Sequence, residues 1–130
     1  MAGKRSCNAV VITGRLAKAV EFNEAAEFLE DEKRNAAGDL FVDAGIAAAD
    51  VICCVRLGEH SNSTNHSEAI ALLAKADAGI AKHLTTLLGL KNKVAYDHHT
   101  LSSRECLKMK RAAAHLVERA KLVAAAAGTA

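Results

Sequence analysis

Apolar residues recur at three- and four-residue steps along most of the chain, which is the spacing of one face of an α-helix. The pattern is clearest near the C-terminus, where it runs through Cys106, Met109, Ala113, Leu116, Ala120 and Val123. Polar and small residues divide it into five predicted helices, at about residues 7–29, 36–57, 66–75, 80–96 and 102–125. We therefore predict an all-α protein, an up-and-down bundle of about five helices.

Three polar residues mark expected helix starts. Asn65 with Glu68, and Ser102 with Glu105, have the spacing of a capping box, in which each side chain accepts a hydrogen bond from the other residue's backbone amide. Asn35 is the predicted N-cap of the second helix.

The second predicted helix is rich in small residues between Ala44 and Ala49. Small side chains allow a neighbouring helix to approach closely, so we predict that this helix is the central one of the bundle. Gly58 marks its end, and the polar stretch 59–65 is predicted to be a loop. Residues 77–79 predict a break between the third and fourth helices.

The composition agrees with this fold, and the net charge bears on whether the protein binds nucleic acid. The chain has 130 residues and is 51% hydrophobic. It contains no proline, the residue that interrupts helices because it has no backbone N–H to donate. We predict a single domain over residues 1–130. The net charge of +2 does not indicate a general nucleic-acid binder, although it is compatible with a local basic face.

The four cysteines are predicted to be reduced, buried thiols. Cys53 and Cys54 are adjacent, which fits no metal-binding spacing, and Cys106 belongs to an apolar stripe. Reduced cysteines are typical of the cytoplasm, and no apolar run approaches the ~18 residues of a membrane span. The six histidines form no HExxH pattern. We therefore predict a cytoplasmic protein with no metal, no cofactor and no membrane contact.

Lys91 interrupts the apolar stripe of the fourth predicted helix, which runs through Ile80, Leu84, Leu87 and Val94. One interpretation is that its methylene groups cover the edge of the core while its ammonium group reaches water. The alternative is that Lys91 faces a cleft. His98 would lie on the same side two turns further on if the helix continued that far, and proximity would then tune the protonation of both groups.

The last predicted helix has a basic strip on the side opposite its apolar stripe. Arg104, Lys108, Arg111 and His115 follow one another at steps of three and four residues. Such a strip is either a solvated helix face or a surface that contacts nucleic-acid phosphates. With Lys93, the cations of the strip are the candidate nucleic-acid-binding residues. The chain has one tyrosine and no tryptophan, so stacking on single-stranded bases is poorly supported.

The order of these features resembles a known family. A long first helix precedes the alanine-rich segment 44–53, and His66 opens a short helix after a polar loop. The segment 87–97 (LLGLKNKVAYD) then precedes a final helix from Ser102. From about residue 9 to residue 123 the chain resembles the HEPN superfamily of small helical bundles, in particular its compact actinobacterial-type members. The resemblance implies a homodimer and RNA-related biology.

The resemblance also implies a site. Many HEPN proteins are metal-independent ribonucleases of toxin–antitoxin or defence systems, and others pair with a nucleotidyltransferase. Their active pattern is an arginine, a polar residue and, a few positions later, a histidine, and two such motifs meet across the dimer. Here Lys91 stands for the arginine and Asn92 for the polar residue, while Tyr96 or His98 stands at the histidine position, depending on the gap. A lysine does not reproduce the planar guanidinium group, so the motif departs from the active pattern.

If the site is active, the resemblance implies that His98 transfers protons, because its unperturbed pKa of ~6.5 is near neutral. Lys91 would hold the phosphate, Asn92 would orient it and Tyr96 would donate a hydrogen bond. Three hypotheses follow. The protein is a HEPN-like module with a degenerate motif that binds RNA or a partner such as a nucleotidyltransferase or an antitoxin, an active ribonuclease, or a purely structural helical dimer.

Overall fold

The predicted helices form, close to their expected positions. The computed structural model describes residues 3–62, 65–96 and 98–128, and in that part of the chain there are five helices and two short strands. The helices are α1 (Ala9–Leu29), α2 (Arg34–Leu57), α3 (His66–Ala76), α4 (Ala81–Ala95) and α5 (Ser103–Ala126), and the strands are β1 (Lys4–Ser6) and β2 (Glu59–Ser61). The prediction of an all-α bundle is confirmed.

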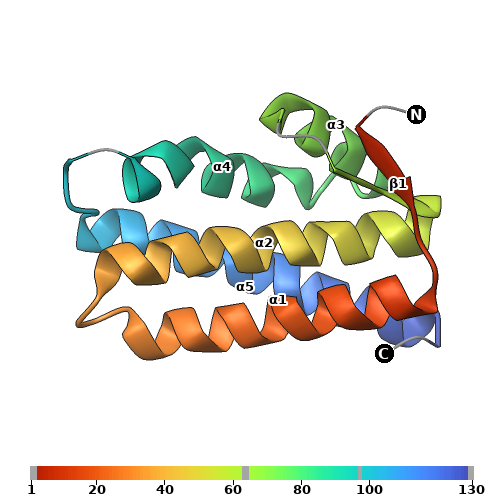
Figure 1. Ribbon diagram of the computed structural model, residues 1–130, viewed down its shortest axis with the longest axis horizontal. Helices are drawn as coiled ribbons and strands as arrows, with labels where there is room; N and C mark the ends of the chain where they lie inside the picture. The colour runs from red at the N-terminus through yellow and green to blue at the C-terminus, as the bar shows by residue number, and fades with distance from the viewer. Residues whose placement is uncertain (1–2, 63–64, 97, 129–130) are drawn as a thin grey trace.

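Successive long helices of the bundle run in opposite directions (Figure 1). Helix α2 packs against α1, α3, α4 and α5, so it is the central helix, as the sequence predicts. The short helix α3 lies at one end of the bundle, near β1 (Figure 1). Within the described residues, no helix has the length and apolar character that crossing a membrane requires.

Glycines in α2 allow two leucines to approach its backbone. A Cβ atom at Gly45 would overlap the buried side chain of Leu87 from α4. A Cβ atom at Gly38 would lie 2.7 Å from Cδ2 of Leu101, which is also fully buried. Because protein interiors are packed as densely as organic crystals, a methyl group at either position would displace its neighbour.

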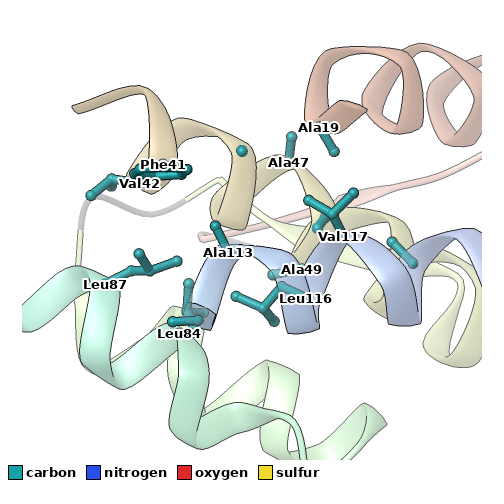
Figure 2. Close-up of a cluster of buried hydrophobic side chains, with 14 of the residues drawn as sticks. Ala19, Phe41, Val42, Ala47, Ala49, Leu84, Leu87, Ala113, Leu116 and Val117 are labelled. Carbon is teal, nitrogen blue, oxygen red and sulfur yellow. The ribbon is translucent and has the colours of Figure 1, made fainter. Parts of the chain in front are cut away.

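The core is built mainly from alanine and leucine, as the composition suggests. Each fully buried leucine or phenylalanine contributes roughly 1.5–3 kcal/mol relative to an exposed one. Figure 2 shows part of this core, in which the labelled side chains are Ala19, Phe41, Val42, Ala47, Ala49, Leu84, Leu87, Ala113, Leu116 and Val117.

Both predicted capping pairs are present at helix starts. Oδ1 of Asn65 accepts a hydrogen bond from the amide of Glu68 at 3.1 Å. The hydroxyl of Ser102 accepts one from the amide of Glu105 at 3.1 Å, and Oε1 of Glu105 accepts one from the amide of Ser102 at 2.9 Å. An N-cap of this kind typically stabilises a helix by about 1 kcal/mol.

The prediction that Asn35 caps the second helix is wrong. Helix α2 begins at Arg34, two residues before the predicted start, and its N-cap position is occupied by Lys33 without a side-chain cap. Oδ1 of Asn35 instead accepts a hydrogen bond from the amide of Leu101 at 2.8 Å. Asn35 therefore anchors the start of α5 to α2, a contact between residues that are far apart in sequence.

The prediction that residues 59–65 form only a loop is also wrong. Glu59, His60 and Ser61 form β2, which pairs antiparallel with β1 so that His60 lies opposite Arg5. Three-residue strands are too short to produce a recognisable alternation of polar and apolar residues. Their pairing joins the segment before α1 to the segment after α2.

The prediction of four reduced cysteines is wrong for two of them. Cys7 and Cys54 form a disulfide bond between residues 47 positions apart. The sequence signal is weak because Cys54 adjoins Cys53 on α2, and only the fold brings Cys7, which precedes α1, to the end of α2. Cys53 and Cys106 are free and buried, as predicted.

Candidate functional site

The predicted catalytic residues lie at the end of α4 and in the segment that follows. Lys91 and Asn92 belong to the last turns of α4, where Lys91 is half-buried and Asn92 is exposed. Tyr96 is the C-cap residue, and its amide donates a hydrogen bond to the carbonyl oxygen of Asn92 at 2.9 Å. The Tyr96 side chain is 78% exposed.

His98 does not continue the helix. The last residue of α4 is Ala95, so the condition under which His98 would share the helix face of Lys91 is not met. The exposed ring of His98 lies against the ring of His99, with 4.0 Å between their centroids and a tilt of 37°. Asp97, the last residue of the segment 87–97, lies outside the described residues.

Lys91 lines a pocket of about 80 Å³ together with residues of α2 and α3. The walls of this pocket come from α2, β2, α3 and α4, and most of them are apolar. His66, Ser61, Cys53 and Asp50 add polar groups to the lining. Lys91 therefore lies at a pocket within one chain, and His98, the second residue of the cleft interpretation, is not among the residues that line it.

A buried ion pair borders this pocket and was not recognised from the sequence. Asp50 on α2 is only 7% exposed, and its Oδ2 lies 2.6 Å from Nη2 of Arg15 on α1. Nδ1 of His60 on β2 lies 3.8 Å from the other carboxylate oxygen. A charged residue inside the apolar segment 44–53 was the available sequence signal, because buried carboxylates are almost always paired.

Burial and charge act in opposite directions on the carboxyl group of Asp50. Removal from water raises its pKa, and the neighbouring charge and hydrogen bond of Arg15 lower it, with a net pKa above the ordinary value. Asp43 lies on α2 three residues before Ile46. Its pKa is also raised, because of burial and the nearby charge of Asp39. The charge of Lys91 lowers the pKa of Asp43, which places these two side chains within electrostatic reach.

The predicted basic strip of α5 is exposed to solvent. Arg104, Lys108, Arg111 and His115 are all exposed, on the side of α5 opposite its buried stripe. Over the part of the chain that the structure covers, no ion pair involves Arg104, Lys108 or Arg111. The other cations of α5 each have a carboxylate partner: Lys110 pairs with Glu30, Arg119 with Asp77 and Lys121 with Glu118.

Lys93, the fifth candidate for nucleic-acid binding, is differently placed. Its Nζ lies 2.9 Å from Oε2 of Glu105, so its charge is neutralised within the protein. Lys93 therefore differs from Arg104, Lys108 and Arg111, which have no ion-pair partner in the described residues.

One histidine of the strip packs against a histidine of α4. The rings of His83 on α4 and His115 on α5 are stacked, with 4.3 Å between their centroids and 16° between their planes. Burial, the charge of His115 and the charge of Lys82 all lower the pKa of His83. The stacked rings therefore contribute to the contact between α4 and α5, which is a structural role.

The two free thiols are poor nucleophiles. Burial and the charges of Asp50 and Glu59 raise the pKa of Cys53 to about 12, and burial is also the main cause that raises the pKa of Cys106. Reactive cysteines have lowered pKa values, so neither thiol is prepared for catalysis. The described residues contain no group of three histidine, cysteine, aspartate or glutamate side chains arranged to hold a metal ion.

No family model matches the sequence, and no curated protein matches it either.

Proposed function

We propose that the protein is an RNA-binding helical module, resembling HEPN proteins with a degenerate active-site motif, and that it contacts RNA through the basic strip of α5. One observation carries the proposal: Arg104, Lys108 and Arg111 expose charges that no carboxylate of the described chain neutralises, whereas the remaining cations of α5 are paired. Cations without a partner are free to release counterions from a phosphate backbone.

The geometry of the strip suits a backbone ligand. From Arg104 to His115 the strip extends over about 17 Å, because an α-helix rises about 1.5 Å per residue. A row of that length can meet several successive phosphates. Arginine and lysine on an exposed helix face bind phosphate oxygens, and such contacts do not depend directly on the base sequence. We therefore expect weak, sequence-independent and salt-sensitive binding.

The resemblance also implies a homodimer, and the outer face of α1 supports it. Val10 and Phe28 are 79% and 88% exposed. They are separated by five full turns and so lie on the same side of α1. A second copy packed antiparallel on this face would bring Val10 of one chain towards Phe28 of the other. A nucleotidyltransferase or an antitoxin is the alternative occupant that the resemblance implies.

The ribonuclease hypothesis has less support in a single chain. It requires Lys91, Asn92, Tyr96 and His98 to act on one phosphate. Lys91 instead lines a pocket with residues of α2 and α3, whereas Tyr96 and His98 lie exposed beyond the end of α4. Binding without turnover is therefore the function we favour.

The test measures binding of a fluorescently labelled single-stranded RNA by fluorescence anisotropy at low salt. We expect binding by the natural protein and its loss in the triple variant Arg104→Gln, Lys108→Gln, Arg111→Gln. The matched control removes the same number of charges from exposed positions elsewhere, as Arg5→Gln, Lys18→Gln, Lys75→Gln. Equal loss in both triple variants would contradict a defined binding strip.

The same samples distinguish binding from cleavage. Electrophoresis of the RNA after incubation with a metal chelator shows whether the strand is intact. Intact RNA supports the binding module, and shortened RNA that is protected by His98→Ala supports the ribonuclease. Absence of any RNA binding by the natural protein would contradict this proposal and leave the partner-binding module and the structural dimer as the remaining hypotheses.

A cytoplasmic location is part of this proposal, since RNA is found there. Disulfide bonds are rare in that compartment, so the bond between Cys7 and Cys54 has to be considered in the assay. Binding should be measured with this bond intact and after reduction. Because the strip lies on α5 and the bond joins the start of α1 to the end of α2, we expect equal RNA affinity in both states.

A further inference from the structure

The pocket beside Lys91 has the composition of a small-molecule site. It lies between α2, β2, α3 and α4, and none of its lining residues comes from α5. The apolar part is formed by Ile46, Ala69, Leu84 and Leu88. A concave apolar surface with a few convergent polar groups is the usual form of a ligand site.

The polar groups of the pocket are not equivalent. Asp50 is already engaged, because Arg15 approaches its Oδ2 at 2.6 Å from α1. The thiol of Cys53 is kept protonated by burial. Lys91 remains as a half-buried cation that has no ion-pair partner within the described part of the chain. His66, the first residue of α3, adds an imidazole next to the positive end of that helix.

From this arrangement we propose that the pocket binds a small apolar monocarboxylate, with its carboxylate group on Lys91 and its hydrocarbon part between α2, α3 and α4. The volume of about 80 Å³ accommodates roughly five to eight non-hydrogen atoms, at ~10–15 Å³ for each water-sized unit. Short branched or linear aliphatic acids have this size. The proposal does not depend on RNA binding, because the pocket shares no residue with the basic strip.

Two carboxylates of the protein compete with such a ligand for the charge of Lys91. Asp43 is within electrostatic reach of Lys91, and Asp39 adds a further negative charge beside Asp43. These charges weaken the attraction of Lys91 for an anion without forming an ion pair with it in the described residues. Replacing Asp43 by asparagine should therefore strengthen ligand binding, about two- to threefold for a partly screened charge.

The probe set consists of three molecules that share one hydrocarbon part: 3-methylbutanoate, 3-methylbutan-1-ol and 3-methylbutylamine. Binding to the full chain is measured by NMR titration of the methyl groups of Ala49, Ala69, Leu84 and Leu88. We expect the carboxylate to bind with a Kd of about 1 mM, as is typical of a ligand this small. The alcohol and the amine should bind at least about tenfold more weakly, because a charge-assisted hydrogen bond to Lys91 is lost.

Three variants locate the site. Lys91→Met keeps the length of the side chain and should weaken carboxylate binding about tenfold, whereas Lys82→Met, on an exposed position of the same helix, should leave it unchanged. Ala69→Leu fills the pocket and should abolish binding. Ala69 is only half-buried, so circular dichroism should show that this variant remains folded.

Several results would overturn the proposal. Equal binding of the alcohol would show a purely apolar cavity, and tighter binding of the amine would assign the site to Asp50 or Asp43. Methyl shifts confined to other parts of the core, or carboxylate binding that persists in Ala69→Leu, would place the ligand elsewhere. No binding of the carboxylate at tens of millimolar would remove the proposal, without bearing on RNA binding.

Discussion

Lys93 and Glu105 form an ion pair that joins the end of α4 to the first turn of α5, with 2.9 Å between Nζ and Oε2. The other oxygen of the same carboxylate accepts the amide hydrogen bond of Ser102. One side chain therefore completes the capping box and ties two helices together. The hydrogen bond from the Ser102 amide, followed by that from Lys93, lowers the pKa of Glu105 to about 2.

This lowered pKa predicts a pH dependence of stability. The pKa of Glu105 in the folded state lies below its ordinary value of 4.5. The charged carboxylate therefore stabilises the fold above pH 4.5, and this contribution is lost as the pH falls towards 2. Glu105→Gln, which keeps an oxygen for the cap, should be less stable than the natural protein at neutral pH. Urea unfolding at several pH values should show the difference shrinking between pH 4.5 and 2, and a constant difference would contradict the assignment.

The basic strip predicts a defined salt dependence of RNA binding. For single-stranded RNA, each phosphate contact contributes about −0.7 to the slope of the logarithm of the association constant against the logarithm of the salt concentration. If three cations contact phosphates, this slope should be about −2. Arg111→Gln should reduce the magnitude of that slope by about 0.7. Anisotropy titrations across a range of salt concentrations measure this slope, with Lys82→Gln as the control that should not change it. A slope unaffected by Arg111→Gln would remove this residue from the interface.

Two glycine substitutions should have opposite effects on stability. Gly45→Ala places a methyl group against Leu87, and overpacking of this kind typically costs about 1–3 kcal/mol, more than the ~1 kcal/mol that alanine gains in helix propensity. Gly14→Ala on α1 meets no neighbouring atom and should stabilise the protein by about 0.5–1 kcal/mol. Denaturant unfolding of both variants gives the comparison. A stabilised Gly45→Ala variant would show that Leu87 can move aside.

The bond between Cys7 and Cys54 should stabilise the fold strongly. In the chain-entropy model, closing a loop with a sequence separation of 47 residues contributes about 4 kcal/mol. Reduction should therefore lower the thermal midpoint of the natural protein. Cys7→Ser should show the lower midpoint with or without reductant. If complete reduction, verified by alkylation and mass measurement, leaves the midpoint of the natural protein unchanged, this stabilisation is absent.

Local sequence patterns were sufficient for the helices. The stripe from Cys106 to Val123 and the pairs Asn65–Glu68 and Ser102–Glu105 are encoded within a few residues, and the structure contains all of them. Features that depend on long-range contacts were missed. Asn35 has the chemistry of a cap, but its partner is Leu101, and no local pattern connects the two.

The candidate site was predictable only in part. The interruption of an apolar stripe by Lys91 left two interpretations open, a side chain that reaches water over the core edge or a cleft shared with His98. In the structure Lys91 is half-buried and lines a pocket. The partners of Asp50, which lines this pocket, were not predictable, because Arg15 and His60 approach its carboxylate from α1 and β2. The position of His98 depended on where α4 ends. Six residues beyond that end, Leu101 is fully buried and packs against Gly38 of α2, a tertiary contact that the local sequence does not reveal.

The sulfur bridge between Cys7 and Cys54 makes a covalent ring of the first two long helices. The turn between them includes Asp31, Glu32 and Lys33, all of which are exposed. A protease that cuts this turn would leave one molecule made of two chains, with α1 still attached to the end of α2. The cut protein would keep its mass on a non-reducing gel and separate into two fragments only after reduction.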